Sequence, residues 1–110
     1  MSSELSREIR KLDVRLEDYT KADQEFVEHV KGYAKTLRKL SEGLEKRREP
    51  PSPDEIKQLS RLRSHTIESL GQVMKSESNV AHERSHLSES YATLILCLEK
   101  EFGKLKPNSI

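Results

Sequence analysis

Residues 5–44 read LSREIRKLDVRLEDYTKADQEFVEHVKGYAKTLRKLSEGL, and one apolar stripe runs through this stretch for almost six heptads. Counting in sevens from Leu5 gives Leu5, Leu12, Tyr19, Phe26, Tyr33 and Leu40. The interleaved series, four residues further on, consists of Ile9, Leu16, Asp23, Val30, Leu37 and Leu44. Eleven of these twelve positions are apolar. Such alternating spacing predicts one helix, roughly 60 Å long, that packs along a partner helix.

The composition favours long helices over a thick globular core. Of the 110 residues, 33% are hydrophobic and 35% are charged, and the chain holds four glycines, four prolines and no tryptophan. Charges of both signs are interleaved, as they are on the solvated faces of long helices. The net charge of +1 gives no global reason to expect a nucleic-acid partner. These features predict an all-α protein.

A tight turn is expected to join two long helices. Pro50 and Pro51 stop the first helix, and Ser52-Pro53-Asp54-Glu55 supplies a capping serine, a proline for the first helical position and a glutamate three residues after the cap. The predicted elements are a helix over 3–49, a turn over 50–52, a helix over 53–103 and a tail over 104–110. Because the turn is short, we expect a single long antiparallel hairpin, similar to a coiled coil.

The two helices match best when the numbers of paired residues add to 103, which sets Leu16 against Leu87. The polar exceptions in this register cluster near Asp23. Two interpretations stay open for them, a loosely packed and solvated waist or an ion pair between Asp23 and Arg84 that fixes the register.

The second helix carries an additional apolar stripe, in which Ile67, Met74, Ala81, Ile95 and Phe102 recur at multiples of seven. A hairpin covers only one stripe, so the second one predicts a third helix or another chain. The simplest closed assembly is a homodimer of hairpins that forms a four-helix bundle. The predicted partner interface consists of Ile67, Met74, Ile95, Leu96 and Phe102.

His82-Glu83-Arg84-Ser85-His86 matches the H-E-x-x-H pattern of zinc-dependent proteases. Neither the G-x-x-H continuation nor a helix that delivers a third ligand follows, and no predicted strand would hold an extended substrate. The alternative interpretations are adventitious zinc capture and a solvent-facing helix, and we favour the latter. With no glycine-rich phosphate loop in the sequence either, we predict no enzyme, no metal site and no cofactor.

The single cysteine, Cys97, lies in an apolar run over 91–98 and is expected to be a packed thiol in a reducing compartment. No signal-peptide pattern is present, and no apolar run is long enough to span a membrane. These observations predict a cytoplasmic protein and leave peripheral membrane association open.

Cations crowd the half of the predicted hairpin that contains the turn. This basic end is expected to contact anionic lipid or an acidic protein surface, and the alternative is a solvated face that nearby glutamates partly neutralise. No aromatic residues are interleaved with the cations, so nucleic acid is not expected. The candidate contact residues are Lys35, Arg38, Lys39, Lys46, Arg47, Arg48, Lys57 and Arg61.

Residues 28–40, EHVKGYAKTLRKL, resemble the segment of F-BAR and related BAR-superfamily domains in which a YAK-x-L-x-K-L phrase ends the first long helix. The stretch 66–88 is similar to the next helix of those domains through Leu70, Ala81, His82, His86 and Leu87. F-BAR domains are longer, and they usually carry an aromatic residue where this chain has Val73 or Met74.

This resemblance implies a dimerising, membrane-peripheral scaffold that links lipid to cytoskeletal or trafficking partners. The alternative function needs no membrane. It is a small α-helical subunit of a larger coiled-coil complex, or an antiparallel finger that binds a small GTPase.

Overall fold

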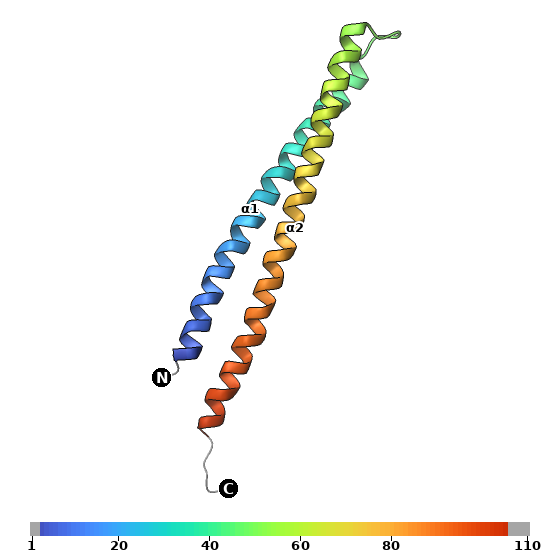
Figure 1. Cartoon of the computed structure of the whole chain (residues 1–110). Coiled ribbons are helices and arrows are strands. Elements are labelled where there is room, and N and C mark those ends of the chain that lie inside the picture. The colour runs from blue at the N-terminus through green and yellow to red at the C-terminus, as the bar shows by residue number, and fades with distance from the viewer. Residues whose placement is uncertain (1–2, 106–110) are drawn as a thin grey trace. The chain divides into compact units, whose positions relative to one another are not determined.

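The computed structural model describes residues 3–105, which form two helices and no strand. Helix α1 spans Ser3–Lys46 and helix α2 spans Pro53–Lys104. Figure 1 shows α1 from blue to green and α2 from green to red, joined by the turn. The predicted all-α antiparallel hairpin is therefore confirmed.

The turn agrees closely with its sequence signals. Helix α1 ends at Lys46, three residues before the predicted end, and Arg47 Nη1 donates to the Leu44 carbonyl at 2.6 Å. Helix α2 begins at Pro53 as predicted. The Glu55 N–H donates to Ser52 Oγ at 3.2 Å, and the Ser52 N–H donates to Glu55 Oε1 at 3.1 Å. This reciprocal pair is the predicted capping box.

A second backbone N–H, from Arg48, also donates to the Glu55 carboxylate at the start of α2. The Arg48 N–H donates to Glu55 Oε2 at 2.9 Å, and this bond and the Ser52 N–H hold the pKa of Glu55 below its ordinary value.

At its C-terminal end, α2 reaches Lys104, and the Leu105 N–H donates to the Phe102 carbonyl at 3.1 Å. Most of the predicted tail, 106–110, lies outside the described residues.

Contacts between the helices divide the described chain into two compact units. The end unit comprises residues 3–22 and 80–105, and the turn unit comprises residues 23–79. In each unit a segment of α1 lies antiparallel to a segment of α2 (Figure 1).

Only one of the two predicted α1 series lies between the helices. The residues counted in sevens from Leu5 are all partly buried. The interleaved series was predicted wrongly, because Ile9 is 45% and Leu16 is 51% exposed, and Val30, Leu37 and Leu44 are exposed as well. Its place is taken by a series one residue earlier, all of it partly buried: Glu8, Arg15, Ala22, His29, Thr36 and Gly43.

The predicted register is wrong by two residues. Arg15 contacts Ser90 in the end unit and His29 contacts Ser76 in the turn unit, and both pairs of numbers add to 105 instead of 103. The predicted register paired large apolar residues with each other. The observed register instead places small α2 residues between the helices, and Ser76 and Ser90 are buried. Small side chains let two helix backbones approach closely, which large opposing side chains would prevent.

The apolar core within one chain is small. Six residues are buried among residues 4–105, all of them on α2, and three are polar. The buried apolar residues are Val80, Leu87 and Cys97, and all three belong to the end unit. Among residues 23–79 the buried side chains are Thr66 and Ser76.

Candidate interaction surfaces

A polar cluster connects the helices of the end unit through Arg15. Its Nη1 donates to Ser90 Oγ at 2.7 Å and to the His86 carbonyl at 3.1 Å, and its Nη2 lies 3.9 Å from Glu89 Oε2. Ser90 is the most deeply buried of residues 4–105, at 1% exposed. Because the Arg15 guanidinium needs this hydroxyl and this carbonyl together, the cluster favours one register of the helices.

Two features fix the helices of the turn unit. His29 Nδ1 and Ser76 Oγ form a short hydrogen bond between the helices. At Gly43 the Leu59 side chain lies so close to the α1 backbone that an added Cβ would lie 2.9 Å from Leu59 Cδ2 and 3.7 Å from Leu62 Cδ1. Glycine is therefore the residue that fits at this position.

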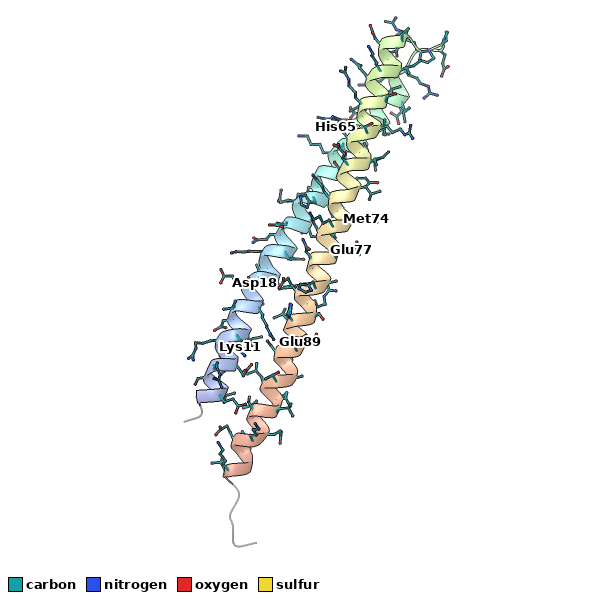
Figure 2. All side chains as sticks on the ribbon, in the orientation of Figure 1. Lys11, Asp18, His65, Met74, Glu77 and Glu89 are labelled. Atoms are coloured by element: carbon teal, nitrogen blue, oxygen red, sulfur yellow. The ribbon has the colours of Figure 1, made fainter. Side chains whose placement is uncertain are left out.

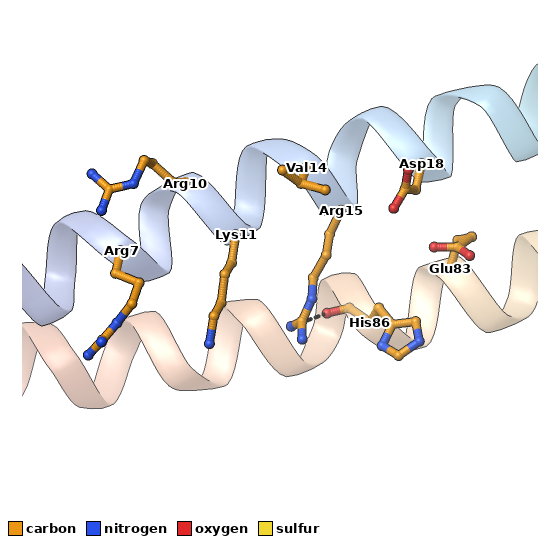
Figure 3. Close-up of a pocket in the computed structure, with 8 residues that line it drawn as sticks. All are labelled: Arg7, Arg10, Lys11, Val14, Arg15, Asp18, Glu83 and His86. Atoms are coloured by element: carbon orange, nitrogen blue, oxygen red, sulfur yellow. Dashed lines mark hydrogen bonds between the residues drawn. The ribbon is translucent and has the colours of Figure 1, made fainter.

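One lateral side of the end unit is polar. Lys100 Nζ lies 3.7 Å from Glu4 Oε1 across the two helices. On the same side a groove of about 620 Å³ is lined by Arg7, Arg10, Lys11, Val14, Arg15, Asp18, Glu83 and His86. Figure 3 shows Arg7, Lys11 and Arg15 pointing from α1 toward α2, with Asp18 and Glu83 beyond Arg15 along the groove. We call this the polar side.

The opposite lateral side of the end unit carries most of its exposed large apolar residues. On α1 the polar-side residues Glu4, Lys11 and Asp18 precede the residues that lie between the helices, whereas Ile9 and Leu16 follow them. On α2 Tyr91 and Leu98 come directly after the buried residues Ser90 and Cys97 in the same way. Because the helices are antiparallel, residues that follow this inner series on both helices share one side. The exposed large apolar residues of the end-unit helices on that side are Ile9, Leu16, Tyr91, Ile95, Leu98 and Phe102, and the exposed polar residues Asp13, Thr20, Arg84 and Ser88 lie among them.

The turn unit repeats this arrangement. Its exposed apolar residues in the same helical positions include Val30, Leu37, Leu44, Ile67, Leu70 and Met74. Leu37 and Leu44 line a hollow of about 290 Å³ on α1, together with Leu40. Figure 2 shows Met74 on α2, where its side chain is 62% exposed. We call these two sets of six residues the apolar face, one set in each unit.

The predicted partner residues divide between the two sides. Ile67, Met74, Ile95 and Phe102 are exposed and belong to the apolar face. Leu96 is 66% exposed, but it lines a groove with Glu4, Thr93 and Lys100 and therefore lies on the polar side. Their role in binding a partner stays a prediction. Leu96 does not share a side with Ile95.

Sequence reasoning missed the α1 half of the apolar face. Ile9, Leu16, Val30, Leu37 and Leu44 were assigned to the contact between the helices. A signal was available, because the position before each of them is small or polar, as in Arg15, His29 and Gly43. A helix whose apolar residues extend over a wider face than one neighbouring helix covers can contact more than one partner.

The eight candidate basic residues all belong to the turn unit and are exposed. Arg47 Nε lies 3.1 Å from Glu49 Oε1, and Arg48 Nε lies 3.9 Å from Glu55 Oε1, so these two are partly neutralised. Lys57 and Arg61 border a shallow groove that also includes Ser60, Ser64, His65 and Glu68. Neither helix, within residues 3–105, combines the length and apolarity that crossing a bilayer requires.

The two histidines of the H-E-x-x-H pattern contact each other. His82 Nε2 and His86 Nε2 lie 3.1 Å apart, and His86 Nδ1 is 3.5 Å from Glu89 Oε2. Within residues 3–105 no group of three or more His, Cys, Asp or Glu side chains is arranged to hold a metal ion.

Cys97 is buried against the first turns of α1. Its Sγ donates to Glu4 Oε1 at 3.7 Å. Burial, followed by the nearby negative charge of Glu4, raises the pKa of the thiol, so Cys97 stays protonated at neutral pH.

Comparison of the chain with protein-family models, with curated protein sequences and with solved structures finds no match.

Proposed function

We propose that this chain is a non-catalytic helical scaffold or adaptor that binds helical partners through its apolar face. The observation that carries the proposal is the placement of six exposed apolar residues on one side of each unit, opposite the polar side in the end unit. Fully burying a large apolar side chain contributes about 1.5–3 kcal/mol, and a half-exposed one forgoes roughly half of that. A partner that covers the apolar face therefore gains substantial free energy.

Neighbouring residues on α2 provide a matched test of this proposal. Ile95 is 58% exposed on the apolar face, and Leu96 is 66% exposed on the polar side. A photoreactive benzoylphenylalanine that replaces Ile95 in the living cell should cross-link to a protein chain, either a copy or another helical protein. The same group at Leu96 should give at least about tenfold less protein adduct, because a hot spot is confined to the covered centre of an interface. Equal adduct yields at both positions would refute the proposal.

A second candidate function, peripheral binding to anionic membranes, is favoured by the turn unit. Lys35, Arg38, Lys39, Lys46, Lys57 and Arg61 are exposed and have no acidic partner within residues 3–105. Each cation near an anionic surface contributes about 1 kcal/mol, and salt weakens the attraction. The resemblance to F-BAR domains also supports this candidate.

Vesicle co-sedimentation tests the membrane candidate. The chain should pellet with phosphatidylserine vesicles at low salt and be released at high salt. Lys35→Glu with Lys39→Glu should abolish pelleting, whereas Lys11→Glu in the end unit should have little effect. Equal binding to neutral vesicles, or pelleting that survives high salt, would rule this candidate out.

A further inference from the structure

The groove on the polar side of the end unit is lined by charges that the chain does not neutralise. Arg7 and Arg10 on α1 have no acidic partner within residues 3–105. Asp18 and Glu83, which also line the groove, have no cationic partner in this part of the chain. The groove has a volume of about 620 Å³, within the range of ligand-binding clefts, so a charged ligand has both the room and the unpaired groups that it needs.

Positive charge is concentrated in the half of the groove nearer the start of α1. Arg7, Arg10 and Lys11 are exposed and lie within little more than one helical turn. Like charges at such spacing repel one another, so an anion in the groove would relieve this repulsion. Lys11 Nζ lies 3.2 Å from Glu8 Oε1, but the Lys11 side chain is 54% exposed, and an ion pair exposed in this way contributes little. Lys11 can therefore exchange Glu8 for a carboxylate of a ligand.

The charges are ordered along the groove. Figure 3 shows Arg7, Lys11 and Arg15 pointing toward α2. They recur every four residues, which is a rise of about 6 Å per step. Arg15 already donates to α2, so Arg7 and Lys11 are the cations of this row that remain for a ligand. Asp18 and Glu83 follow beyond Arg15 and give the far end of the groove negative charge.

We propose that this groove binds an extended segment of another protein that carries acidic residues at its first and third positions and a lysine or arginine at its seventh. Side chains at every second position of an extended chain share one face and lie about 6.6 Å apart, which matches the rise of about 6 Å between Arg7 and Lys11. The seventh position lies about 13 Å beyond the third. Asp18 lies about 10 Å beyond Lys11 along α1. Glu83 is level with Ala22, because paired numbers add to 105, and Ala22 lies about 16 Å beyond Lys11. The cation at the seventh position therefore comes between the two carboxylates.

Other anionic partners match this order of charges less well. A bilayer surface or a nucleic acid presents negative charge throughout, and it would bring some of that charge onto Asp18 and Glu83. A docking helix needs an apolar stripe along the surface that receives it, whereas Val14 is the one large apolar residue among the described residues that line the groove. An extended segment with charges of both signs satisfies the cations and the carboxylates together.

This site goes beyond the proposed function, because the apolar face lies on the opposite side of the end unit. Leu96, the control position for that face, lines a different groove with Glu4 and Lys100. The two sites can therefore be tested separately, and the loss of one leaves the other standing. Together they would let one end unit hold two proteins at once.

Fluorescence anisotropy of short labelled peptides tests the proposal on the whole chain. The first peptide has glutamate at its first and third positions and lysine at its seventh, with serine elsewhere. The control peptide has the same composition, but its lysine stands at the third position and its second glutamate at the seventh. The first peptide should bind at least about tenfold more tightly at low salt, and added salt should weaken its binding.

Charge reversals in the protein locate the site. Arg7→Glu should weaken binding of the first peptide at least about fivefold. Arg84→Glu, the same change of net charge on the opposite side, should weaken it less than about twofold. A peptide with lysine in place of its first glutamate should bind the Arg7→Glu chain more tightly than the wild-type chain. A general loss of structure would not produce this exchange of preference.

Equal affinity for the two peptides of identical composition would overturn the proposal, and so would equal losses in Arg7→Glu and Arg84→Glu. The absence of peptide binding at low salt would refute it as well. If phosphatidylserine vesicles displace the first peptide and Arg7→Glu abolishes vesicle binding, the groove is a general anion surface and the protein segment is rejected as its ligand.

Discussion

Substitution of Gly43 tests the close approach of the helices in the turn unit. Alanine in place of glycine inside a helix usually stabilises the protein by about 0.5–1 kcal/mol, because glycine loses more backbone freedom on folding. At Gly43 the new methyl group would lie 2.9 Å from Leu59 Cδ2, whereas carbon atoms prefer a separation of about 3.5–4.0 Å. The Leu59 side chain must therefore shift, and because its Cδ2 is the free end of a flexible side chain, this shift offsets much of the helix gain without a large net cost.

The chain contains matched controls for this substitution. An added Cβ at Gly32 or Gly71 meets nothing within 4 Å. Gly32→Ala should therefore stabilise the protein by the full helix term, about 0.5–1 kcal/mol, whereas Gly43→Ala should gain little or nothing. Combining Gly43→Ala with Leu59→Ala should relieve the clash, so the two changes should be non-additive.

Urea unfolding followed by circular dichroism measures these differences, with all variants at one protein concentration. The midpoint should rise for Gly32→Ala and stay or fall for Gly43→Ala, with an unchanged denaturant slope. If Gly43→Ala stabilises the protein as much as Gly32→Ala does, the Leu59 side chain does not pack against Gly43, and this contact is refuted.

Four further predictions concern the helix cap, the Glu55 carboxylate, the thiol and the histidines. Ser52→Ala should cost about 0.5–2 kcal/mol in urea unfolding, by removing the acceptor of the Glu55 N–H. Because the pKa of Glu55 is lowered in the folded chain, its ionised carboxylate stabilises the fold fully above the ordinary carboxyl pKa of about 4.3. This stabilisation is lost as the pH falls through the lowered pKa. Glu55→Gln should therefore make the free energy of unfolding depend less on pH in acid. Cys97 should react with a thiol reagent only as fast as the end unit opens, so labelling of the native chain as fast as of the urea-unfolded chain would contradict its burial. His82→Ala with His86→Ala should leave the thermal midpoint unchanged with or without a chelator, and a stoichiometric zinc ion in chain purified without added metal would show that the pair is a metal site.

The amino-acid sequence by itself determined the two helices and the turn between them. Pro50 and Pro51 cannot continue α1, and Ser52 with Glu55 caps α2, so these boundaries depend only on neighbouring residues. The outer stripe of α2, with Ile67, Met74, Ile95 and Phe102, was also predictable, because its residues lie outside any contact one partner helix can make. Partner identity lies beyond such local signals, since it depends on surfaces of another molecule.

Only the tertiary structure decided which columns of α1 face α2. The residues counted in sevens from Leu5 can be combined with either of two interleaved series to give an alternating spacing of three and four. One series contains Leu16 and Leu37, and the other contains Arg15 and Gly43. Hydrophobicity favours the series with Leu16 and Leu37, and the prediction that this series packs against α2 was wrong. The structure places the second between the helices, because Gly43 allows close approach and Arg15 finds Ser90 and the His86 carbonyl across the gap. Those partners lie about 70 residues away along the chain, and no local pattern contains them.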